Sequence, residues 1–189
     1  MSLLNLKPLA DCQTPQEALD ELCAPLRGYR AGLLACEPVL AEEMPEEYRR
    51  LLVHERHMTL ALKDHCRSKL DLYVMDVHRD GDSYRRKIFL TPAGSSQSLE
   101  LGVVRLDLGY LPAGPKHEIL DQHTPLGAVL VKHNVLRRIE PRWYLKFPAG
   151  SPVLEWFGYP HDGPFFGRLG TIWCNDEPAV EVLEIVTLW

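Results

Sequence analysis

The sequence predicts a single α+β domain with a mainly antiparallel, six-stranded sheet and flanking helices. Segments with helical spacing are gathered before residue 66 and over residues 116–133, whereas segments that alternate with a period of two lie elsewhere. Two pairs of these alternating segments are joined by short turn sequences, which is typical of antiparallel hairpins. At 189 residues and 46% hydrophobic composition, the chain can bury one sizeable core.

Three helices are expected before the sheet begins, over residues 15–26, 45–53 and from near residue 59 to 66. Thr14-Pro15-Gln16-Glu17 has the form of a capping box with proline at the first helical position. Acidic residues after Pro45 favour the second helix through the helix dipole. Thr59 is the expected N-cap of the third helix. Glu37-Pro38 is interpreted as an interruption, and we divide the chain into an N-terminal extension, residues 1–44, with one short helix packed on the main domain, residues 45–189.

Six strands are expected, over residues 70–78, 83–91, 99–108, 135–147, 165–174 and 179–189. Asp80-Gly81 predicts a hairpin turn between the first two strands, and residues 175–178 join the last two. Pro141 on the apolar side of the fourth strand predicts an edge or a bulge. Short helices are expected over residues 116–121 and 126–133, and a loop over residues 148–164 that includes Tyr159-Pro160.

Glu184 is the unusual residue of the last strand, because the even positions around it are otherwise apolar and are expected to face inward. A carboxylate there loses its hydration and needs a partner or a proton. Arg86 is likewise the only charge among the even positions of the second strand. If both faces line one cavity, it contains an acid and a guanidinium, either as a buried ion pair or as a site for an anionic ligand.

The composition of the chain limits the classes of partner that it is expected to bind. The net charge of −5 and the scattered basic residues argue against nucleic acid. No apolar run is long enough to span a membrane, and residues 1–15 do not resemble a leader, so we expect a cytoplasmic protein. Five widely spaced cysteines fit reduced, mostly buried thiols. His54 and His57 are three residues apart, not four as a zinc helix motif requires, so no metal site is predicted.

Five short motifs then follow one another along the chain. They are Leu51-Leu52 with His57-Met58-Thr59, Arg86-Lys87-Ile88-Phe89-Leu90, Pro125-Leu126-Gly127, Phe166-Gly167-Arg168 and Val182-Leu183-Glu184-Ile185. As an ordered set, they resemble the chorismate lyase family over about residues 45–188, and are most similar to the branch long described only as a domain of unknown function.

The resemblance implies an α+β fold with a six-stranded antiparallel sheet and an internal, flap-covered site for an aromatic acid, with no cofactor. It implies that Met58 and Leu126, the latter followed by Gly127, lie at the ligand with their backbone amides. Arg86 would bind the ring carboxylate, and Glu184 would meet the oxygen at the far end of the ring. The chain departs from the better-characterised lyases in its longer N-terminal extension and in having His57 where they have a serine, which leaves the substrate open.

The reaction implied is loss of pyruvate from chorismate to leave 4-hydroxybenzoate, or a similar reaction of another aromatic or enolpyruvyl carboxylic acid, with Glu184 and Arg86 catalytic. We expect a monomer or a small homo-oligomer. One alternative is a non-catalytic module that binds a small aromatic acid, like the sensor domains of bacterial transcription regulators. Against it, we expect this chain to have no room for a DNA-binding domain. Another is a scaffold in which Glu184 and Arg86 satisfy each other, which direct contact between them would indicate.

Overall fold

The computed structural model describes residues 7–157 and 163–188. In these ranges it contains one seven-stranded sheet with the order β1-β5-β6-β7-β4-β3-β2, and all neighbouring strands are antiparallel. The strands are β1 (Glu37–Val39), β2 (Leu70–Asp80), β3 (Ser83–Pro92), β4 (Glu100–Asp107), β5 (Arg137–Phe147), β6 (Phe165–Cys174) and β7 (Glu177–Val186). The α+β class and the antiparallel sheet are confirmed.

The predicted count of six strands was wrong, because β1 was taken for an interruption. This strand has only three residues and pairs with β5 at the edge of the sheet, Pro38 opposite Leu145. An edge strand can contain a proline, since one side of its backbone needs no ladder partner. The bulge expected at Pro141 is confirmed, because the register between β5 and β6 shifts between Pro141 and Trp143.

Six α-helices lie in the described ranges. They are α1 (Pro15–Cys23), α2 (Glu46–Leu52), α3 (Met58–Cys66), α4 (Ala113–Leu120), α5 (Leu126–Lys132) and α6 (Val153–Phe157). Helix α1 ends three residues earlier than expected, and α4 begins at Ala113 instead of residue 116, with Pro115 in its first turn, where a missing N–H breaks no helical bond. Helix α6 falls in the segment predicted as a loop, and Tyr159-Pro160 lies outside the described residues, as does Trp189. None of these helices has the length and apolar composition needed to span a bilayer.

The two expected N-caps have different outcomes. The Oγ1 of Thr14 accepts a hydrogen bond of 3.1 Å from the N–H of Glu17, so this cap is confirmed, although the Glu17 carboxylate bonds the N–H of Gln13 and not that of Thr14. The prediction for Thr59 was wrong. Helix α3 already begins at Met58, and the extended N-cap residue, His57, makes no side-chain cap bond.

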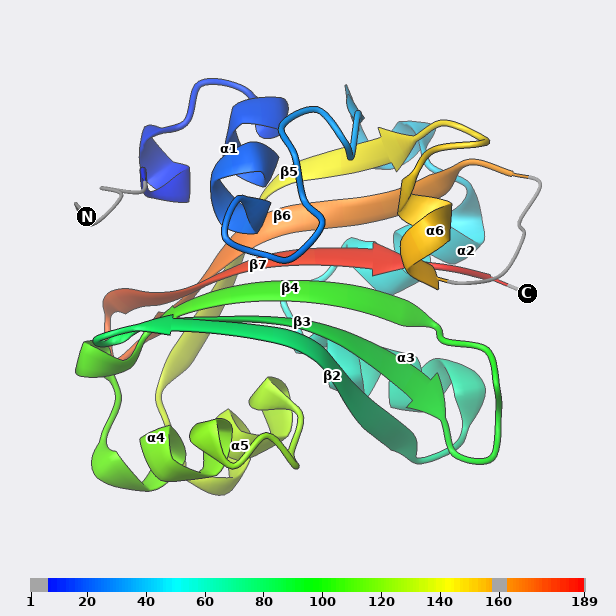
Figure 1. Ribbon diagram of the computed structural model, residues 1–189. Helices are drawn as coiled ribbons and strands as arrows, with labels where there is room; N and C mark the ends of the chain where they lie inside the picture. The colour runs from blue at the N-terminus through cyan, green and yellow to red at the C-terminus, as the bar shows by residue number, and fades with distance from the viewer. Residues whose placement is uncertain (1–6, 158–162, 189) are drawn as a thin grey trace.

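Helices cover both faces of the sheet (Figure 1). Helices α1 and α6 pack on one face, the α1 face, with Leu183 and Ile185 of β7 beneath them. Helices α2 to α5 pack on the other face, the α5 face, with Val182 and Val186 beneath them. The expectation that only the even positions face inward was therefore wrong. Arg85, an odd position of β3, is only 2% exposed.

Candidate functional site

A pocket lies on the α5 face, where the first turns of α3 and α5 meet above β3, β4, β6 and β7. The structure brings all five predicted site residues into its wall: Met58, Arg86, Leu126, Gly127 and Glu184. The rest of the lining is largely apolar and includes Ile88, Leu90, Val104, Ile172 and Val182. The space open to the centre of a water-sized sphere is about 40 Å³, enough for roughly three waters.

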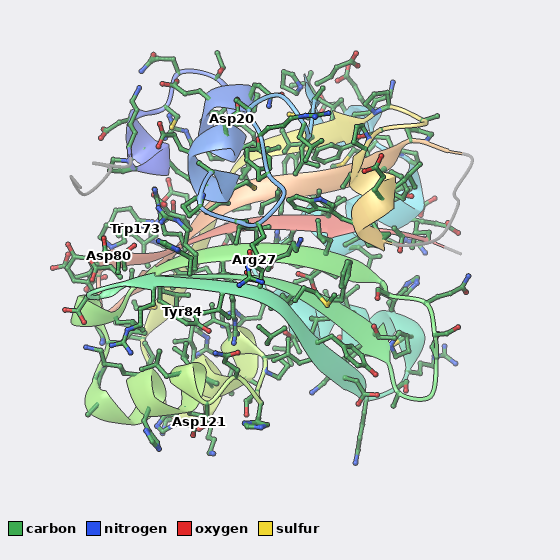
Figure 2. The ribbon with its side chains drawn as sticks, viewed as in Figure 1. Asp20, Arg27, Asp80, Tyr84, Asp121 and Trp173 are labelled. Carbon is green, nitrogen blue, oxygen red and sulfur yellow. The ribbon has the colours of Figure 1, made fainter. Side chains whose placement is uncertain are left out.

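Arg86 enters the pocket from β3 and is 1% exposed. Its Nε and Nη1 have no hydrogen-bond partner in the described part of the chain. Burial lowers the pKa of Arg86, and the nearby Tyr84 phenol opposes this shift. Tyr84, two residues away on the same strand face, points between the sheet and the α4–α5 layer (Figure 2). The floor of the pocket thus contains a buried cation for which the described residues provide no hydrogen-bonded carboxylate.

Glu184 is paired with Arg168, not with Arg86. Its Oε2 accepts a 2.5 Å hydrogen bond from Nε of Arg168, which faces it directly across β6 and β7. Arg168 also donates to the main-chain oxygens of residues 52, 54 and 56, and so holds the loop between α2 and α3. The scaffold hypothesis, a Glu184–Arg86 pair, was therefore wrong. The Oε1 of Glu184 accepts no hydrogen bond from any described residue, and Glu184 lines the pocket.

The strand register places Arg86 and Glu184 at opposite ends of the pocket. Arg86 lies opposite Val104 of β4, which lies opposite Val182 of β7, two residues before Glu184. With strands about 4.8 Å apart and a rise of about 3.4 Å per residue, their Cα atoms are about 12 Å apart. Arg86 and Glu184 are therefore far enough apart to contact opposite ends of one ligand.

Sequence reasoning missed Glu100, which also lines the pocket and is 3% exposed. Its Oε2 has no partner among the described residues. Burial raises the pKa of Glu100 well above its ordinary value and the charge of Glu184 adds to this, while Arg168 opposes it. Both burial and the charge of Glu184 favour the protonated form of Glu100 over the charged one. The signal was present, because residues 100, 102 and 104 are the even positions of β4 and share the face of Glu184.

His57 closes the pocket between the two helix starts. A Cβ on Gly127 would lie 2.9 Å from Cβ of His57, so only glycine lets α5 begin this close to the imidazole. Burial, followed by the charges of Arg137 and Arg168, lowers the pKa of His57 to about 4, so the ring is neutral at pH 7. The N–H groups in the first turns of α3 and α5 have no partner among the described residues. They belong to Met58, Thr59, Leu126 and Gly127.

His54 and His57 do not form a metal site in the described ranges, where no three His, Cys, Asp or Glu side chains gather closely enough to hold an ion. The Nδ1 of His54 instead accepts a 3.2 Å hydrogen bond from the N–H of Arg56 and lies 3.3 Å from Nη1 of Arg168. All five cysteines are free thiols, and three of them are buried.

No protein-family model matches the chain, and no curated protein matches it in sequence. Three solved structures are similar in part. YydK from Bacillus subtilis, described as a possible transcriptional regulator, is 14% identical with a TM-score of 0.43, over 62% of this chain and 58% of YydK. A domain from Bordetella bronchiseptica, described as the ligand-binding domain of a GntR-family transcriptional regulator, is 11% identical with a TM-score of 0.44, over 64% of this chain and 83% of that domain.

PhnF from Mycobacterium smegmatis is 14% identical with a TM-score of 0.44, over 68% of this chain and 62% of PhnF. This chain therefore spans less than two thirds of YydK and of PhnF. At this level of similarity, none of the three structures carries a function over to the chain, and the function has to be argued from the pocket itself.

Proposed function

We propose that the pocket binds a small aromatic carboxylic acid, with the ligand carboxylate on Arg86. The observation that carries this proposal is the buried guanidinium with two unpartnered nitrogens in the pocket wall. A buried charge without a counter-ion costs several kcal/mol, so an anion that pairs with it gains more than it would at the surface. The planar guanidinium can grip a carboxylate with two parallel hydrogen bonds.

The remaining walls suit a ring with a polar far end. Apolar side chains such as Ile88, Val104 and Val182 would flank the ring, and the free main-chain N–H groups of Met58 and Leu126 lie at the rim. Glu184 and Glu100 lie at the far end. The space open to the centre of a water-sized sphere, about 40 Å³, corresponds to roughly three waters, so a benzoate needs the pocket lining to adjust.

Calorimetric titration with benzoate and 4-hydroxybenzoate at matched ionic strength tests the proposal. Arg86→Met should weaken binding by roughly tenfold to a hundredfold, since hydrogen bonds to charged groups contribute about 1.5–3 kcal/mol. Arg85→Met is the matched control, because Arg85 is equally buried but lies on the α1 face. Equal losses of affinity in the two variants would contradict the placement of the ligand carboxylate on Arg86.

A second candidate function is pyruvate elimination from chorismate, which the resemblance implies. The observation that favours it is the pair of carboxyl groups at the far end, where burial raises the pKa of Glu100 and Arg168 pairs with Glu184. Neighbouring acids in such different surroundings are typical of acid–base catalysis. Chromatography of pyruvate and 4-hydroxybenzoate formed from chorismate checks it. Equal product from wild type and Glu184→Gln would contradict catalysis, since a positioned acid or base contributes about 10²–10⁴-fold.

A further inference from the structure

Glu100 and Glu184 converge on one end of the pocket. Gly102 lies opposite Glu184 in the β4–β7 ladder, and Glu100 precedes Gly102 by two residues on the same face. The Oε1 of Glu100 lies 3.3 Å from the point that a Cβ on Gly102 would occupy, so its carboxyl group folds over this glycine toward Glu184. Both side chains line the pocket. The absent side chain at Gly102 leaves this space to Ile88 and to the carboxyl group of Glu100.

The two carboxyl groups offer opposite hydrogen-bonding abilities. Glu184 has the Arg168 guanidinium at 2.5 Å and one further acceptor oxygen, Oε1. The Oε2 of Glu100 has no hydrogen-bond partner among the described residues. Facing it are the Glu184 carboxylate, which favours a proton on Glu100, and the Arg168 guanidinium, which disfavours it. A neutral carboxylic acid is a hydrogen-bond donor, whereas a carboxylate only accepts.

We propose that Glu100 is a specificity-determining residue that donates a hydrogen bond, as a neutral acid, to an uncharged oxygen of the ligand opposite its carboxylate. The inference rests on the proposed function and narrows the ligand class to aromatic carboxylates with a para hydroxyl or ether oxygen. A phenol donates its proton to Glu184 and accepts from Glu100. A para amine accepts poorly, and a para carboxylate meets the negative charge of Glu184.

The test compares benzoate, 4-hydroxybenzoate and 4-aminobenzoate by calorimetry at pH 7 with wild type, Glu100→Gln and Glu100→Met. Gln keeps a donor at the same length, and Met keeps the volume without one. Wild type and Glu100→Gln should prefer 4-hydroxybenzoate to both other acids. In Glu100→Met this preference, measured as the ratio of the two affinities in the same variant, should fall by about tenfold. An undiminished preference in Glu100→Met overturns the assignment.

An infrared measurement supplies a readout that a merely structural residue would not affect. Wild type at pH 7 should show the carbonyl stretch of a buried protonated carboxylic acid, and Glu100→Gln should lack it. Absence of this band in wild type overturns the proposal. If wild type binds the three acids equally and Arg86→Met abolishes binding, the proposed function is supported and the specificity role of Glu100 is contradicted. If wild type binds none of them, both fall.

Discussion

The two faces of β7 each contain an arginine–glutamate pair, and the two pairs differ in which carboxylate oxygens they leave without a hydrogen bond. On the α1 face, Glu181 pairs with Arg105 through Oε2, and its Oε1 accepts a 2.7 Å hydrogen bond from the N–H of Leu9. Arg105 also donates to the main-chain oxygen of Lys7 at 2.9 Å. Both carboxylate oxygens are in use, and the pair fastens the N-terminal segment, residues 7–12, to the sheet.

On the α5 face, Arg168 likewise fastens a segment, residues 52–57, through main-chain oxygens. Its partner Glu184, however, keeps one oxygen without a hydrogen bond from any described residue, and it lines a cavity. An ion pair whose acceptors are all used by the chain can only hold structure. An ion pair that keeps one carboxylate oxygen free beside a cavity can stabilise the fold and also bind a ligand.

The largest expected effect tests this difference directly. Glu184→Gln leaves the buried Arg168 without its counter-charge and should lower the free energy of unfolding by about 3–5 kcal/mol in urea titrations. Glu181→Gln should cost less, because its partner Arg105 is only partly buried. Only Glu184→Gln should also weaken binding of 4-hydroxybenzoate. If Glu184→Gln has the same unfolding free energy and the same affinity as wild type, both the structural and the ligand-binding role of this carboxylate are contradicted.

The segment that Arg168 holds on the α5 face, residues 52–57, should also lose stability in acid more readily than the segment held on the α1 face. Because the folded pKa of His57 is lowered to about 4, the unfolded chain binds more protons between pH 6.5 and 4, and stability is lost as the pH falls through this window. The loss from His57 should reach about 3 kcal/mol. Urea unfolding at several pH values should show a smaller loss in His57→Gln. The pKa of His54 is also lowered, so some acid dependence should remain. An unchanged loss would mean that His57 titrates normally.

Glu100 should produce the opposite pH dependence on the same face. Its folded pKa is raised, so the folded state holds a proton that the unfolded chain releases above about pH 4.5. Its contribution is therefore fully present at lower pH and is lost as the pH rises, at about 1.4 kcal/mol per pH unit until the folded pKa is reached. Glu100→Gln should remove this slope and be more stable than wild type at pH 7. A variant less stable than wild type at pH 7 would contradict a buried neutral acid.

The smallest effect belongs to the α1 face alone. Thr14→Ala removes the hydrogen bond that caps α1 and should cost about 1 kcal/mol of unfolding free energy. Affinity for 4-hydroxybenzoate should not change, because α1 packs on the face opposite the pocket. A change in affinity would show that the two faces are coupled through the sheet.

Local patterns in the sequence predicted most of the elements. The extents of β3 and β7, the Thr14 cap and the bulge at Pro141 depend on neighbouring residues, which is why they could be predicted from the sequence. The burial of both faces of these strands could not, because it depends on which helices cover the sheet. The β1 strand could not, because three residues carry no alternation and the strand exists only through its pairing with β5. The Thr59 cap failed for a related reason, since packing against α5 fixes where α3 begins.

The sequence by itself determined that Arg86 and Glu184 are charges on buried strand faces, because a period of two assigns faces without knowledge of the partners. Only the tertiary structure decided which charges meet. Strand order and register pair Glu184 with Arg168, leave Arg86 without a carboxylate partner among the described residues, and set Glu100 beside Glu184. These contacts join strands far apart in the chain. Their energies depend on burial and on distances between side chains, which no local pattern specifies.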